Sequence, residues 1–363
     1  PKRSSIAIAT SVEQTAVLNG QRRIKELAAV SAIAAICSTL VAIAMLLLFG
    51  EGGIVAFVLA GPIAVFFLGH IYTIRDRLSR PQSRAVIGAA KLARGGVPLM
   101  IAALALPLGV LAVRAILQSE LGQAASGHFH AAWVISSLYV GLVLNSMSAD
   151  YFPRLSAAIH DHKTANRLVN EQTEIALLVI APAFLLLMGC ASFVVRILYS
   201  SEFSEAVFVL RWQLLGDALK VVSWPLGFIL LASGDGKKLI YTEYAAVSAF
   251  IALSWIGVIV VGIQGVGGAF LGMYLAYTPL IYWVGRKKTG FAWSQSVKSA
   301  LAVIISWLLL ILAASYFSNW LAASLGIASA AVVGLLNLRK LDSLIELPGV
   351  LHNIAQFRIA NIH

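Results

Sequence analysis

The sequence contains little charge and almost no cysteine. Charged residues make up 12% of the 363 residues, and Cys37 and Cys190 are its two cysteines. Both fall in apolar stretches with no Cys or His at ligand spacing, which excludes a disulfide framework or zinc site and predicts two core side chains. No Asp-x-Asp, Walker or glycine-rich phosphate loop occurs. We therefore expect neither a bound metal nor a cofactor.

Hydrophobic residues are abundant instead. They make up 60% of the chain, and the mean hydropathy is +0.87. A soluble domain of this length does not carry such a composition, and a bilayer span needs ~20 apolar residues. The sequence therefore predicts an all-α polytopic membrane protein. Ten apolar segments are candidate spans: 27–49, 53–74, 97–118, 129–149, 174–195, 206–232, 239–261, 267–285, 299–317 and 320–337.

The basic residues predict how these segments cross the membrane. With the connection before the first segment in the cytoplasm, all 27 lysines and arginines fall on cytoplasmic connections except Arg114, Arg196, Arg211 and Lys220. This asymmetry follows the positive-inside rule and predicts a cytoplasmic C-terminus. The net charge of +11 therefore reflects topology and contact with membrane lipids rather than nucleic-acid binding. Residues 75–96 suit either an amphipathic surface helix or a plain linker.

One candidate span, 206–232, carries a polar stripe. Gln213, Asp217, Lys220 and Trp224 follow one another at steps of four, three and four residues, which places them on one helix face. Asp217 lies near the middle of the span. A charge at the bilayer centre costs at least ~2.5 kcal/mol, so this face should meet other helices or a watery cavity.

Two interpretations of Asp217 and Lys220 remain open. They can line a cavity, where Lys220 would bind phosphate, or they can form a buried ion pair that only positions the helix. Asp217 is the deepest carboxylate in the sequence.

Other charged residues in the spans have simpler interpretations. Arg114 lies four residues from the outer end of its segment, where it can hold phosphate at an outward mouth or snorkel to the interface. Arg211 is on the opposite helix face from Lys220, and we expect it to snorkel to the outer end. Glu243 is expected to pair with Lys237 or Lys238.

Three stretches of sequence carry a family resemblance. They are 16–28, 131–156 and 203–221, and the last includes Trp212-Gln-Leu-Leu-Gly-Asp-Ala-Leu-Lys220. These stretches resemble the Wzx-type bacterial polysaccharide flippases of the multidrug/oligosaccharidyl-lipid/polysaccharide exporter superfamily. The last looks like the tenth helix of O-antigen and enterobacterial common antigen translocases. The resemblance identifies the ten segments as helices five to fourteen of a fourteen-helix, two-lobe, MATE-like bundle whose first helices are absent here.

The resemblance also implies a division of the chain. Residues 1–96 would be the remainder of an amino-terminal lobe, 97–285 a six-helix carboxy-terminal lobe, and 286–363 two extra helices with a cytoplasmic tail. The two lobes of such proteins open alternately to the two sides of the membrane.

The implied function is transport without a chemical step. The cargo would be an undecaprenyl-pyrophosphate-linked oligosaccharide, such as an O-antigen repeat unit, moved by ion-coupled transport from the inner to the outer leaflet of the bacterial inner membrane. For that cargo, Lys220, Gln213, Trp224 and Arg114 are the candidate substrate contacts. The resemblance also implies ion antiport, for which Asp217, the deepest carboxylate, is the candidate coupling residue. A polysaccharide polymerase and a chain-length regulator are candidate protein partners.

Two other functions remain open. A cation-coupled multidrug exporter of the same superfamily would favour an acidic, aromatic cavity. A membrane enzyme of polysaccharide assembly, such as a polymerase or ligase, would need a sizeable outer loop or globular domain, and the sequence predicts neither. We therefore expect a protein that is not an enzyme.

Overall fold

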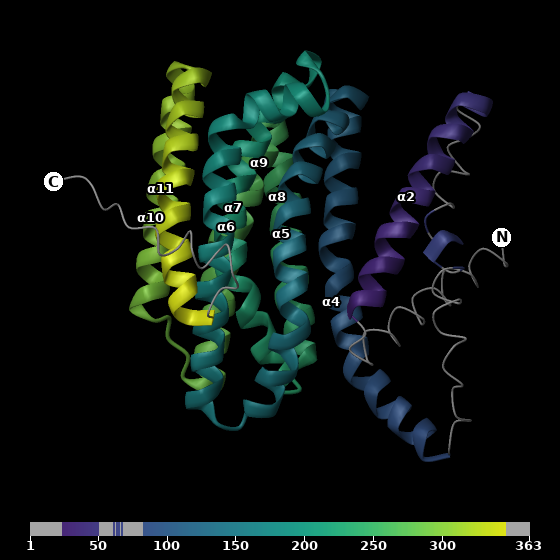
Figure 1. Ribbon diagram of the computed structural model, residues 1–363, viewed down its shortest axis with the longest axis vertical. Coiled ribbons are helices and arrows are strands. Elements are labelled where there is room, and N and C mark those ends of the chain that lie inside the picture. Colours follow the sequence, from purple (N-terminus) through teal and green to yellow (C-terminus); the bar gives the residue numbers. More distant parts are fainter. Residues whose placement is uncertain (1–23, 51–60, 62, 66, 68–82, 346–363) are drawn as a thin grey trace. The chain divides into compact units, whose positions relative to one another are not determined.

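The computed structural model describes residues 24–50, 61, 63–65, 67 and 83–345, and these form nine α-helices and one short 3₁₀-helix (Figure 1). The chain divides into two compact units, residues 1–88 and 89–363. Helix α2 belongs to the first unit, and α4 begins in the first and continues in the second. The elements are α2 (Ile24–Phe49), α4 (Ser83–Leu121), α5 (Gln123–Ala158), α6 (His162–Leu198), η2 (Ser201–Phe203), α7 (Ser204–Ala232), α8 (Gly236–Val261), α9 (Gln264–Thr289), α10 (Gln295–Phe317) and α11 (Asn319–Ile345).

The predicted class, an all-α polytopic membrane protein, is confirmed. Within the described residues, eight helices are long and apolar enough to cross a membrane. The predicted span at 267–285 is helical within α9, but α9 is not among the eight because glycines and tyrosines lower its hydropathy. The predicted span at 53–74 lies mostly outside the described residues.

The helices extend beyond their apolar segments. Residues 150–173, which connect two of the predicted spans, are mostly helical, because α5 continues to Ala158 and α6 begins at His162. Asp161 caps α6 by accepting hydrogen bonds from the backbone N–H groups of Lys163 and Thr164. Hydropathy detects the part of a helix that suits lipid, whereas a cap can start the helix earlier on polar residues.

The cysteine prediction is also wrong for one of the two residues. Cys37 is exposed on α2, and Cys190 on α6 is partly exposed. Most large apolar side chains of α2 are exposed as well, including Leu47 at 82%. A membrane helix can direct apolar side chains outward because lipid, unlike water, accepts them.

Helix α7 forms the centre of the second unit. It packs most extensively against α9 and also against α5 and α6, while α8 packs against α9. Helices α10 and α11 contact each other and lie against α6 (Figure 1). Two thirds of the span that contains α7 is buried, the largest share among the eight spans. A helix covered on all sides can carry polar side chains that lipid would reject.

Close backbone contact joins α6 to α11. A Cβ atom built on Gly189 would lie 2.5 Å from the carbonyl oxygen of Ala322 and 2.8 Å from Cα of Gly326. Only glycine fits at that separation, as at many helix contacts in membranes. The contact therefore fixes the last helix against the core of the unit.

Hydrogen bonds hold the connection between α9 and α10 against α6. Asn166 donates from Nδ2 to the carbonyl oxygen of Thr289 at 2.9 Å, and Asn170 accepts at Oδ1 from the backbone N–H of Ser294 at 2.7 Å. These bonds satisfy backbone groups that the ends of two helices leave unpaired.

Candidate functional site

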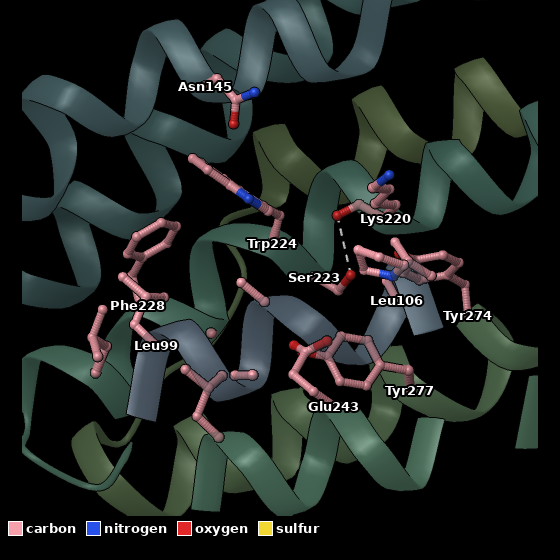
Figure 2. Close-up of a pocket in the computed structure, with 16 residues that line it drawn as sticks. Leu99, Leu106, Asn145, Lys220, Ser223, Trp224, Phe228, Glu243, Tyr274 and Tyr277 are labelled. Atoms are coloured by element: carbon pink, nitrogen blue, oxygen red, sulfur yellow. Dashed lines mark hydrogen bonds between the residues drawn. The ribbon is translucent and has the colours of Figure 1, made fainter. Parts of the chain in front are cut away.

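A cavity of about 530 Å³ opens beside α7, and five helices line it. Its size lies within the usual range of small-molecule sites. Figure 2 shows Phe228 and Leu99 on the opposite side of the view from Lys220, Tyr274 and Tyr277. The lining residues are Leu99, Ala102, Ala103, Leu106 and Pro107 of α4, Asn145 of α5, Lys220, Ser223, Trp224, Gly227, Phe228 and Leu231 of α7, Leu239 and Glu243 of α8, and Tyr274 and Tyr277 of α9.

The polar stripe on α7 meets two different environments. Lys220 and Trp224 line the cavity, but Gln213 and Asp217 do not. One turn above Lys220 the helix is covered by its neighbours: a Cβ on Gly216 would lie 2.7 Å from Cδ1 of Phe270 in α9. The cavity therefore follows only the part of the stripe that begins at Lys220.

Asp217 connects the cavity to the interior of the bundle. Its side chain is 1% exposed, and Ser136 of α5 donates a hydrogen bond to its Oδ2. Its Oδ1 lies 3.9 Å from Nζ of Lys220, whose side chain is 18% exposed. A buried charge needs such partners, because an unpaired one costs several kcal/mol. Asp217 thus lies in the packed interior of the bundle, and Lys220 lies at the cavity wall.

Gln213 has no partner at all within the described part of the chain. The residue is fully buried, and neither Oε1 nor Nε2 makes a hydrogen bond. Most buried side-chain amides in proteins are paired, and an unpaired group costs roughly 1–3 kcal/mol. The unpaired amide therefore lowers the stability of the observed conformation.

Glu243 lines the cavity, whereas the sequence analysis expected its carboxylate to pair with Lys237 or Lys238. Tyr277 donates a hydrogen bond from Oη to Oε1 of Glu243 at 2.5 Å. The predicted pairing with Lys237 or Lys238 is wrong, since Lys238 instead pairs with Asp235 at 3.2 Å. Two helical turns separate Glu243 from the start of α8, and its face turns toward α9.

The two remaining arginines of the spans lie away from this cavity. Arg114 of α4 is half-buried and does not line it. Arg211 of α7 is 3% exposed and donates to Oδ1 of Asn319 at 3.1 Å and to Oγ of Ser192 at 3.4 Å. The prediction that Arg211 snorkels to the interface is wrong, because polar groups of α6 and α11 hold it inside the protein.

This arrangement can bind a polar or charged group inside an apolar bundle. Lys220 supplies a cation, Asn145 and Ser223 supply an amide and a hydroxyl elsewhere on the wall, and Trp224 offers an aromatic face. No group of three or more metal-ligating side chains occurs in the described ranges.

The chain is similar to known proteins over more than half of its length. Residues 5–208, more than half of the chain, match the family described as polysaccharide biosynthesis protein. The chain is 22% identical over 192 residues to the lipid III flippases of Escherichia coli (strain K12) and Shigella flexneri. The match covers 53% of this chain and 46% of each relative, so the chain spans about half the length of the curated relatives it matches.

The family of the chain is assigned from the family match. No solved structure matches the chain significantly. The matched residues include α2, α4, α5 and α6 and the start of α7. By the extent of this match, the chain belongs to the polysaccharide biosynthesis protein family.

Proposed function

We propose that this protein is a flippase for a lipid-linked oligosaccharide. Its cargo would be an undecaprenyl-pyrophosphate-linked repeat unit, such as that of an O-antigen, moved from the inner to the outer leaflet of the bacterial inner membrane. The observation that carries the proposal is a cavity inside apolar helices whose wall presents Lys220 among amide, hydroxyl and aromatic groups. Membership of the family and the similarity to lipid III flippases support it.

The chemistry of the cavity suits both parts of such a headgroup. Lys220 can bind a phosphate oxygen through a charge-assisted hydrogen bond, which is stronger than a neutral one. Asn145 and Ser223 can exchange hydrogen bonds with sugar hydroxyls, and Trp224 can stack on a sugar ring. We assign no cargo contact to Gln213 or Arg114 in this conformation, because neither lines the cavity.

Asp217 would act on the cargo through Lys220. Because its carboxylate lies 3.9 Å from Nζ of Lys220, Asp217 and a cargo phosphate compete for the same cation. Protonation of Asp217 would free Lys220 for the phosphate, and its deprotonation would favour release. This competition couples ion movement to alternating access, with Asp217 as the coupling residue.

A cation-coupled drug exporter is the second candidate. Glu243 lines the same cavity beside Tyr274 and Tyr277, and an acid among aromatic rings suits a cationic drug. One lysine and one glutamate line the cavity. The balance of charge therefore favours neither cargo, and transport assays must separate them.

Complementation of a flippase-null strain tests the proposal. Wild-type protein should restore surface polysaccharide. Lys220→Ala should reduce it about tenfold or more, as expected when one charge-assisted contact is lost, and Lys220→Arg should retain more activity. Asp217→Asn should also impair transport. Lys298→Ala, at an exposed lysine of α10, is the matched control at equal membrane abundance.

Three results would contradict the proposal. Normal polysaccharide from both Lys220→Ala and Asp217→Asn would remove the pair from transport. Drug efflux without any polysaccharide would support the exporter. Delivery of repeat units to the outer leaflet by a separate flippase, with only their polymerisation depending on this protein, would identify an enzyme of assembly.

A further inference from the structure

A second cavity lies where α6 ends and α7 begins, and it shares no lining residue with the first. Its volume is about 350 Å³, and residues of α6, α7, α10 and α11 and the η2 turn line it. Two arginines, Arg196 and Arg211, and five serines contribute to its wall, but no aspartate or glutamate does. The charged side chains of its wall are therefore both cationic.

Arg211 is held in position with unused hydrogen-bonding capacity. Its donors reach Asn319 Oδ1, Ser192 Oγ and, at 3.5 Å, the carbonyl oxygen of Met188, all of which are neutral. No ion pair to Arg211 occurs within the described ranges, and its Nη1 donates to no residue there. A guanidinium that is 3% exposed and has no counter-ion favours the binding of an anion.

The surroundings reinforce the positive potential. Arg196 is exposed at the same cavity. The carboxylate of Glu205, in the first turn of α7, is occupied by Nδ1 of His128 at 3.1 Å. Ser204, the first residue of α7, lines the cavity, and Phe203 before it supplies no side-chain cap. The positive end of the α7 dipole lies beside two arginines, and the nearby acids Glu202 and Glu205 do not line the cavity.

We propose that this cavity binds a phosphate group. Planar guanidinium forks match phosphate oxygens bidentately, and serine hydroxyls complete such sites. The source can be a phospholipid headgroup or free phosphate. Exposed apolar side chains next in sequence to the lining residues, Ile197 at 81% and Phe317 at 85%, offer a surface for acyl chains. By the predicted topology, the site faces the outer leaflet. It does not depend on the transport function.

The test compares two phosphate sources on the purified protein. Native mass spectrometry would measure retention of phosphatidylglycerol, and thermal unfolding in detergent would measure stabilisation by inorganic phosphate. Arg196→Gln and Arg211→Gln should each weaken whichever interaction is found by about tenfold. Arg196 is exposed, so its variant tests the site even if Arg211→Gln unfolds. Arg167→Gln, at an exposed arginine near the other end of α6, is the matched control.

Each outcome decides the proposal. Retention of phosphatidylglycerol without stabilisation by phosphate identifies a lipid site, and stabilisation by inorganic phosphate identifies a site for the free anion. Either result supports the proposal when Arg196→Gln weakens the measured interaction and Arg167→Gln does not. Absence of both interactions, or equal binding by wild type and Arg196→Gln, would overturn it.

Discussion

Lys220 and Asp217 lie three residues apart on α7, yet only the lysine reaches the cavity. The acid is enclosed by Ser136 and by packing from α9, so it can influence a ligand only through the cation beside it. At the residue scale, we therefore propose a different role for each member of the pair. Lys220 would contact the cargo, and Asp217 would act on the cargo through Lys220.

Asp235 supports a prediction about acid stability. It lies between α7 and α8 and pairs with Lys288 at the end of α9 and with Lys238. The hydrogen bond from Lys288 is the main cause that lowers the pKa of Asp235 below its ordinary value of 3.8. A lowered pKa gives stability that is present above the ordinary value and is lost as pH falls through the folded-state value.

We therefore expect Asp235→Asn to lower thermal stability slightly at pH 7, by less than about 1 kcal/mol for an exposed cluster. The difference from wild type should shrink below pH 3.8. Unfolding in detergent across pH 3 to 7 would measure it. Asp150→Asn, which breaks a pair within one helix, serves as control. A difference that grows in acid would contradict the assignment.

Contacts within one helix were predictable from spacing, and contacts between helices were not. Asp150 and Arg154, four residues apart on α5, form an ion pair at 3.1 Å. Glu243 and Arg211 instead meet partners on other helices, Tyr277 and Asn319. Spacing along a helix gives the face of a side chain, but only the fold decides which neighbour covers that face.

At the scale of elements, hydropathy predicted most of the described helices but not their ends. The ends depend on caps and polar turns, such as Asp161 before α6. Helix α9 departs most from the other helices in composition, because it packs between α7 and α8 and brings two tyrosines to the cavity. A helix enclosed by protein is under less pressure to be uniformly apolar than one that faces lipid.

The close contact between α6 and α11 leads to a second prediction, about stability. Gly189→Ala should destabilise the protein by about 1–3 kcal/mol, because its methyl group would meet backbone atoms of α11. Gly268→Ala in α9 is the control, since its Cβ would have no neighbour within 4 Å. Thermal unfolding in detergent compares the two. Equal stability of both variants would show that the two helices separate easily.

At the scale of the molecule, the charge distribution predicts the orientation in the membrane. With Cys37 and Cys190 replaced by alanine, Glu120→Cys should react with a membrane-impermeant maleimide added to intact cells from the outer side. His160→Cys, between α5 and α6, should react only after the membrane is opened. Both positions are exposed. The reverse pattern would invert the topology and move the second cavity to the inner leaflet.

The described structure does not test the predicted three-part division of the chain. The compact units are residues 1–88 and 89–363, whereas the predicted boundaries were at 96 and 285. Lobes of a transporter are defined by their relative motion as well as by packing. The division into lobes stays a prediction.

The orphaned amide of Gln213 has a consequence for how the protein works. A leucine at this position would remove the desolvation cost, so Gln213→Leu should raise the free energy of unfolding by roughly 1–3 kcal/mol. If Gln213 gains a hydrogen-bond partner when the bundle rearranges, the same variant should transport more slowly. The amount of surface polysaccharide would measure transport, and the melting temperature would measure stability. Greater stability at unchanged speed would mean that the amide stays unpaired throughout the cycle. Under the proposed function the bundle must rearrange, and the unpaired amide of Gln213 lowers the stability of the conformation that it would leave.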